Sequence, residues 1–126
     1  MSKQCQTFDL EDRLIEFAVR IIRMVESLPP SKVGEHITAQ IVRSGTSAAP
    51  NYGEAQSAES RSDFIHKMKV CLKELRETKV WLRIIAKAEL IKPESKLQPL
   101  IDENNQLISI FVSSIKTAKQ KDRKSP

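Results

Sequence analysis

The sequence has little glycine, little cysteine and few aromatic residues. Its 126 residues include three glycines, two cysteines and one tryptophan, and aromatic side chains make up 5% of the total. So little glycine argues against a β-rich protein with many tight turns. Cys5 and Cys71 are too few and too isolated for a disulfide framework or a cysteine-based zinc site.

Long apolar runs are also missing. No stretch reaches the length that spans a membrane, and the first nine residues are polar, without the apolar centre of a signal peptide. These absences predict a cytoplasmic protein that does not enter a membrane. We expect no metal or other cofactor either, because the two histidines are thirty residues apart and no Glu-x-x-His repeat accompanies them.

Helical periodicity dominates what is present. Hydrophobic residues make up 40% and charged residues 29%, which is typical of a globular helical protein with one domain. Asp9 and Ser60 each precede such a pattern and are predicted helix caps. Apolar residues recur at spacings of three and four through four segments, residues 9–28, 32–56, 60–91 and 93–119, the last followed by a short basic tail. The predicted fold is all-α, a single antiparallel up-and-down four-helix bundle.

A stretch of small and polar residues, 43–55, interrupts the large apolar residues of the second segment. Small side chains let a neighbouring helix come close, so we predict that Ser44 and Ser47 permit such an approach. Three polar residues of the stretch are predicted to make contacts between helices or subunits: Arg43, Asn51 and Glu54. Pro50 removes a backbone donor, which predicts a kink or an early end of the second helix near residues 48–51.

Two helices have more apolar surface than a single subunit needs. The first has a second apolar stripe, made of Ile15, Val19 and Ile22, and the third has Trp81 and Ile84 beside its main stripe. These five residues predict an interface between copies of the chain, that is, a homo-oligomer. Nearby, Glu74 and Glu77 are predicted to meet Arg76 or Arg83 of a neighbouring subunit.

Positive charge is concentrated in the third segment and the tail. The formal net charge is +5, with nine Lys and Arg against four acids in residues 60–92 and five against one in residues 116–126. Five cations fall within one sector of the third helix: Lys69, Lys73, Arg76, Arg83 and Lys87. This stripe predicts binding to the phosphate backbone of RNA or DNA, and the lack of interleaved aromatic residues predicts little preference for sequence.

Two other functions compete with nucleic-acid binding. Arg61 and His66 have the Arg-four-residues-His spacing of small helical ribonucleases, in which Arg stabilises the transition state and His acts as acid or base. A purely structural scaffold that binds another, unidentified protein is the second alternative. We favour a protein without catalytic activity, because no serine of the polar stretch has a histidine placed as its base.

Four segments of the chain, residues 8–11, 40–55, 60–67 and 73–78, resemble those of a known family. Over roughly residues 8–118 the chain is similar to the four-helix-bundle proteins encoded by intervening sequences within bacterial 23S ribosomal RNA genes. The resemblance implies an up-and-down bundle that assembles as a ring-like homopentamer. It also implies a relation to the accessory variability protein of diversity-generating retroelements, which binds nucleic acid and works beside a reverse transcriptase.

Overall fold

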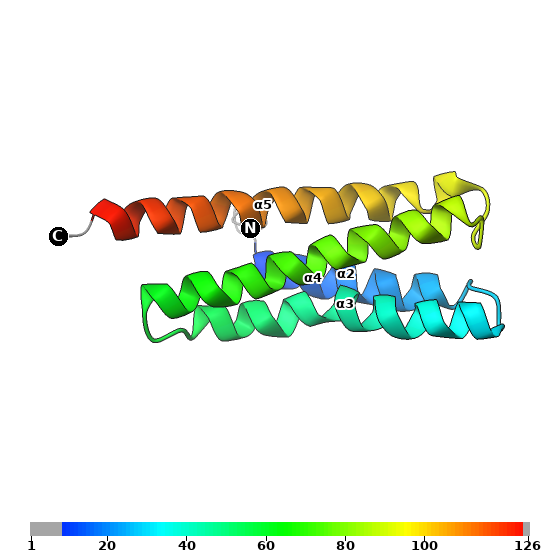
Figure 1. The fold of residues 1–126 in the computed structure, drawn as a ribbon, viewed down its shortest axis with the longest axis horizontal. Helices are drawn as coiled ribbons and strands as arrows, with labels where there is room; N and C mark the ends of the chain where they lie inside the picture. Colours follow the sequence, from blue (N-terminus) through cyan, green and yellow to red (C-terminus); the bar gives the residue numbers. More distant parts are fainter. Residues whose placement is uncertain (1–8, 125–126) are drawn as a thin grey trace, which may run out of the picture.

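The structure is a computed structural model that describes residues 9–124 and the side chains of residues 9–121, so Cys5 lies outside the described part. Within residues 9–124 the chain forms no strand and four α-helices: α2 (Leu10–Val25), α3 (Lys32–Gln56), α4 (Arg61–Lys87) and α5 (Gln98–Lys124). Consecutive helices run in opposite directions, and all lie roughly along one axis (Figure 1). The predicted all-helical, up-and-down bundle is confirmed.

Each of the first three helices begins at a side chain that accepts hydrogen bonds from the first turn. The Asp9 carboxylate accepts from the amides of Glu11 and Asp12, and the Ser60 hydroxyl accepts from the amide of Asp63. Ser31 does the same for the amide of Gly34. These bonds satisfy donors that a helix start leaves unpaired, and they confirm Asp9 and Ser60 as caps.

The turn between α4 and α5 differs from the prediction, which extended the third helix to residue 91 and began the fourth at 93. Helix α4 ends at Lys87, because Glu89 takes a left-handed backbone conformation with φ of 55° that cannot continue a right-handed helix. Pro93 is extended and is followed by a short 3₁₀ helix, η1 (Glu94–Lys96). Helix α5 therefore starts at Gln98, and it takes in much of the predicted tail by continuing to Lys124.

Pro50 does not end α3. The helix continues through it to Gln56, so the predicted early end near residues 48–51 is wrong. Pro50 lies on the exposed side of the helix, where water can reach the carbonyl group that loses its amide partner. Side chains also tie the neighbouring turns together, since Thr46 Oγ1 donates to the Val42 carbonyl and Asn51 Nδ2 to the Ser47 carbonyl.

The core occupies the space between the four helices. Cys71 is buried in it, as predicted, and the Tyr52 and Phe111 rings meet edge to face with centroids 5.9 Å apart. The largest fully buried apolar side chains come from every helix: Phe17, Leu14, Ile21, Ile41, Met68, Leu75, Leu82, Ile85, Leu107 and Phe111. Burial of these side chains from water is the main stabilising term of the fold.

The small residues of α3 allow α2 and α4 to pack on both of its sides. A Cβ on Gly45 would lie 2.9 Å from Cγ1 of Ile21 on α2, so α2 approaches α3 too closely for a larger residue. On the other side, Thr78 Oγ1 of α4 lies 2.8 Å from the Ser44 hydroxyl. The predicted close approach at the small stretch is therefore made between helices of the same chain.

Helix α5 packs along α4 and contacts α2 less extensively. The contact with α2 includes an ion pair in which Arg13 donates to both Glu103 carboxylate oxygens, at 2.7 and 2.9 Å, and to the Gln106 side chain at 2.7 Å. Two parallel bonds between guanidinium and carboxylate hold the two groups in one geometry. This pair closes the fourth side of the bundle.

Candidate nucleic-acid interface

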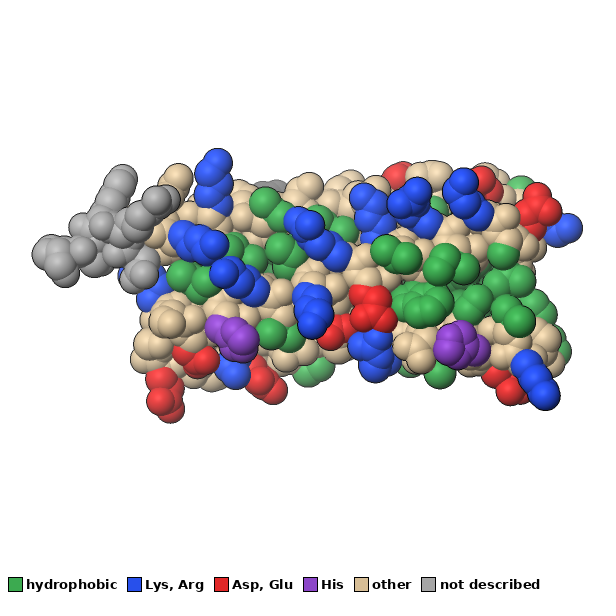
Figure 2. Space-filling model, in the orientation of Figure 1, with side chains coloured by type: hydrophobic (Ala, Val, Ile, Leu, Met, Phe, Trp, Pro, Cys, Tyr) green, Lys and Arg blue, Asp and Glu red, His purple; other side chains and the backbone are tan. Residues whose placement is uncertain are grey.

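The outward face of α4 is the most positively charged surface that one helix provides. The five cations predicted there, Lys69, Lys73, Arg76, Arg83 and Lys87, are all exposed. Residues of the same helix that point the other way, such as Leu75 and Leu82, are buried. Figure 2 shows Lys and Arg side chains spread along this side of the molecule over α4 and α5. We call the five cations the α4 basic stripe.

The α4 basic stripe is unpaired within the described part of the chain. Ion pairs there use other cations, Arg13, Arg43 and Lys67, and none of the five stripe residues. The acids of α4 are Asp63, Glu74 and Glu77, and helical spacing places all three away from the centre of the stripe. The stripe therefore presents cationic side chains that form no ion pair with a carboxylate of the described residues.

Arg43 of α3 holds the two acids that flank the stripe. Its guanidinium donates to Glu74 Oε1 at 3.1 Å and, through its other terminal nitrogen, to Glu77 Oε2. Both acids therefore pair with an arginine of their own chain, and their predicted contact with Arg76 or Arg83 of a neighbouring subunit stays a prediction. The predicted polar contact of Arg43 with another helix is confirmed.

Trp81 extends this cluster along the α3–α4 seam. Its indole Nε1 donates to Glu77 Oε2 at 3.0 Å, and its ring meets His36 edge to face with centroids 6.1 Å apart. The Trp81 side chain is partly buried as a result. Sequence reasoning missed His36 as its neighbour, because nothing in the local pattern of α3 indicates which residue of α4 it meets.

The other predicted interface residues divide into surface and interior. Ile15, Ile22 and Ile84 are 46%, 45% and 38% exposed, and Val19 is partly buried beside the first two. Val80, on the outward face of α4, is 52% exposed and was not predicted. These apolar side chains are available at the surface of one chain, which is what a contact between copies requires.

The small and polar residues of α3 mostly serve the chain itself. Ser44 is fully buried, and Ser47 Oγ donates to the Ser44 carbonyl at 3.4 Å. Asn51 bonds within α3 instead of reaching another helix. Glu54 does reach another helix, through Lys67 Nζ on α4 at 3.4 Å.

The structure places Arg61 and His66 in different surroundings. Five residues along a helix correspond to a rotation of about 140°, so the two side chains leave α4 in different directions. Arg61 lines a groove with α5, and His66 is exposed and is not part of that groove. Among the side chains of residues 9–121, no three His, Cys, Asp or Glu gather as a metal site would need. No helix of the described residues has the length and apolar character that crossing a membrane requires.

The groove beside Arg61 was missed by sequence reasoning. It has a volume of about 530 Å³ and lies between the start of α4 and the last turns of α5. Its lining residues are Arg61, Phe64, Ser113, Ser114, Thr117, Ala118 and Lys121. The hydroxyl residues and Lys121 recur along α5 at helical spacing, and this pattern could have been read from the sequence. Only the fold brings these residues beside Arg61.

Comparison with known proteins identifies a family and similar solved structures. A model of the 23S rRNA-intervening sequence protein family matches residues 7–113. A crystal structure from Bacteroides thetaiotaomicron, described as a protein of unknown function from the S23 ribosomal protein family, is 35% identical in sequence with a TM-score of 0.79. The similarity covers 86% of this chain and 99% of that one. No curated protein matches the chain.

Proposed function

We propose a function from one premise: this chain belongs to the 23S rRNA-intervening sequence protein family. Family membership specifies the architecture, so we infer the activity from the residues at the surface. The protein acts as a non-enzymatic, homo-oligomeric bundle that binds the phosphate backbone of RNA or DNA through the α4 basic stripe. The observation that supports this most directly is the set of five exposed cations that pair with no described carboxylate.

The length of the stripe suits several successive phosphates. From Lys69 to Lys87 the helix rises about 27 Å, at 1.5 Å per residue. Cations held on one face at this spacing attract a phosphate backbone, whereas recognition of bases requires stacking or base-edge contacts in addition. The aromatic residue nearest along α4, Trp81, is held by Glu77 and His36 on the α3 side, so the proposed binding is independent of sequence.

Self-association would multiply this surface. Ile15 and Ile22 of α2 and Ile84 of α4 offer apolar contact area on a chain whose core is already filled. We propose that copies join through these residues and form a ring-like homopentamer, the assembly that the family resemblance implies. Each added subunit would bring five more stripe cations to one assembly, which raises the local density of positive charge seen by a nucleic acid.

Binding measured across a salt series tests the proposal. If all five stripe cations contact phosphates of duplex DNA, affinity should fall about 500-fold between about 50 and 200 mM salt. Reversing three of them together, Lys69→Glu, Lys73→Glu and Arg76→Glu, should weaken binding at low salt at least tenfold. A matched control reverses three exposed cations elsewhere, Arg23→Glu, Lys32→Glu and Lys92→Glu, and should weaken binding much less.

Two results would overturn the proposal. Absence of binding at low salt would favour the scaffold that holds another protein. Equal losses in the two triple variants would show that net charge, and not the α4 basic stripe, drives the binding. Circular dichroism and assembly mass of each variant should match the wild type, because all six substituted side chains are exposed.

A separate experiment tests the proposed absence of catalysis. Labelled RNA incubated with the wild type should remain intact, since Arg61 and His66 point in different directions on α4. Cleavage by the wild type that disappears in His66→Ala would replace this part of the proposal with the ribonuclease alternative. Cleavage that persists in His66→Ala would indicate a contaminating nuclease.

A further inference from the structure

Among the described residues, α2 is shorter than the other helices and does not reach one end of the bundle. Helix α2 has 16 residues, whereas α4 and α5 have 27 each, so α2 is shorter by about 16 Å at 1.5 Å per residue. Figure 1 shows that α2 starts well inside the end where α4 begins and α5 finishes. The groove of about 530 Å³ lies at this end, between the start of α4 and the last turns of α5.

The lining of the groove combines three kinds of chemistry. Arg61 and Lys121 provide positive charge, and the hydroxyls of Ser113, Ser114 and Thr117 provide donors and acceptors. Phe64 and Ala118 form its apolar part, with Ala118 buried and Phe64 packed partly against the core. No carboxylate belongs to the lining among the described residues.

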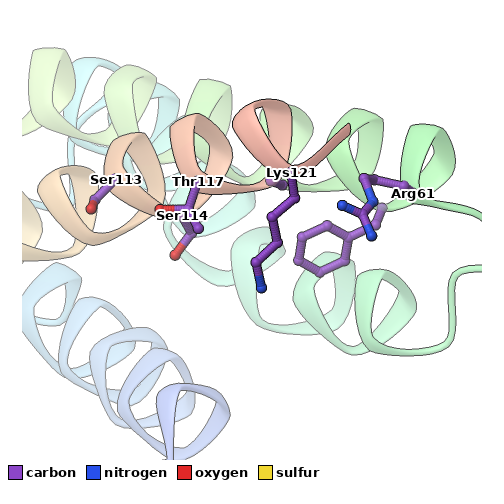
Figure 3. A pocket seen from close by; sticks show the side chains of 7 residues that line it. Arg61, Ser113, Ser114, Thr117 and Lys121 are labelled. Atoms are coloured by element: carbon purple, nitrogen blue, oxygen red, sulfur yellow. The ribbon is translucent and has the colours of Figure 1, made fainter. Parts of the chain in front are cut away.

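The two cations converge although they come from different helices. Figure 3 shows the side chains of Arg61, from α4, and Lys121, from α5, directed toward the same opening. The labelled hydroxyl residues follow α5 away from Lys121 in the order Thr117, Ser114, Ser113. Arg61 forms no ion pair with any described residue, and it belongs to the first turn of α4, where the free amides and the helix dipole also favour an anion.

We propose that this groove binds one phosphorylated nucleotide. Its phosphate lies between the Arg61 guanidinium and the Lys121 ammonium, its sugar hydroxyls exchange hydrogen bonds with Ser114 and Thr117, and its base lies against Phe64. A planar guanidinium suits phosphate oxygens, and an aromatic ring suits the face of any base. A volume of this size is within the range of pockets that hold small ligands.

The site is separate from the α4 basic stripe, since the two share no residue. Two ligands carry the groups that this site would bind: a free nucleotide and the phosphorylated end of a nucleic-acid strand. Binding of the second ligand rests on the proposed function, because the stripe would then hold the rest of the strand. Other anions, such as an acidic peptide, would lack the flat base that Phe64 accommodates.

Calorimetric titration of the full chain with adenosine monophosphate and with adenosine tests the site. We expect the monophosphate to bind at least tenfold more tightly than adenosine, and R61Q/K121Q to remove this difference. The control R23Q/K32Q, which also loses two cations, should retain it. Phe64→Leu preserves apolar volume without the aromatic face and should weaken binding of both ligands about equally.

Equal binding of the monophosphate and adenosine, or an unchanged affinity in R61Q/K121Q, would overturn the proposal. A short acidic peptide that displaces the monophosphate at equal concentration would overturn it as well. A ten-nucleotide RNA with and without a 5′-phosphate distinguishes the two ligands: preference for the phosphorylated strand assigns the strand end, and no preference together with tight monophosphate binding assigns the free nucleotide.

The two proposals fail in different experiments. Reversing Lys69, Lys73 and Arg76 should leave monophosphate binding within twofold of the wild type while it weakens strand binding. Loss of monophosphate binding in that variant would contradict a separate groove site. If the wild type binds strands but not the monophosphate, the groove proposal is wrong and the proposal for the α4 basic stripe still holds.

Discussion

The carbonyl oxygen of Pro29 occupies the space that a Cβ atom on Gly34 would need. A Cβ built on Gly34 would be 1.9 Å from that oxygen, far inside the contact distance of the two atoms. The obstacle is backbone, so it cannot move aside as a flexible side chain would. The tight turn between α2 and α3 therefore depends on the absence of a side chain at the third residue of α3.

Gly34→Ala is expected to destabilise the protein by about 1–3 kcal/mol, since the turn must shift to admit the methyl group. Gly53→Ala is the matched control in the same helix. A Cβ there meets nothing within 4 Å, and alanine is the better helix former, so it should stabilise by about 0.5–1 kcal/mol. Urea denaturation followed by circular dichroism measures both. Equal stability of the two variants would contradict the close approach of Pro29.

Asn104→Leu is expected to stabilise the fold. Asn104 is fully buried in α5, and its Nδ2 donates to the Leu75 carbonyl at 3.3 Å, but its Oδ1 has no hydrogen-bond partner among the described residues. An unsatisfied buried acceptor costs about 1–3 kcal/mol, so a leucine of similar size should raise the free energy of unfolding by about 1–2 kcal/mol. Asn105→Leu, at the exposed neighbouring position, should change it by less than about 0.5 kcal/mol. A lower melting temperature for Asn104→Leu than for the wild type would show that the amide stabilises the core.

Cys71 should resist alkylation until the protein unfolds. Burial raises the pKa of the Cys71 thiol to about 12, from about 8.5 in an unfolded chain. In a Cys5→Ser background, iodoacetamide at pH 8.5 should modify the unfolded protein readily and the folded protein at least a hundredfold more slowly. Rapid modification of the folded form would place Cys71 nearer to solvent than the structure does.

The raised pKa of Cys71 also makes the stability of the fold depend on pH. The folded state keeps the Cys71 proton that the unfolded state releases, so its contribution to stability is fully present below about pH 8.5 and is lost as pH rises toward 12. Cys71→Ala should be less stable than wild type at pH 7 because it leaves a small cavity, and its stability should fall less steeply with pH. Parallel stability curves for the two proteins between pH 8 and 10 would contradict this origin.

Replacing Ile15 and Ile22 by lysine should dissociate the proposed assembly. Both side chains are nearly half exposed in the single chain, so their loss costs the monomer little while it places charge in the contact between copies. Light scattering should give a multiple of 14.3 kDa for the wild type and a single mass of 14.3 kDa for the variant. Val33→Lys, at an exposed valine of α3 outside the predicted interface, is the control and should keep the wild-type mass. A wild type that is monomeric at high concentration would contradict the assembly itself.

Much of the fold was predictable because its signals are local. The caps at Asp9 and Ser60 depend on residues two or three positions away, and the span of α3 follows from a continuous periodic pattern. The early end of α4 was not predictable in this way. Glu89 is not a glycine, and its left-handed conformation reflects the path that the chain must take toward α5.

The sequence alone determined which residues share a helix face, because 3.6 residues per turn places Lys69, Arg76 and Lys87 together whatever the other helices do. Only the tertiary structure decided that Arg43 takes Glu74 and Glu77, and that Arg61 and Lys121 line one groove. Such meetings depend on the rotation and axial offset of each helix. Those quantities are set by the packing of all four helices around one core, and no single segment contains them.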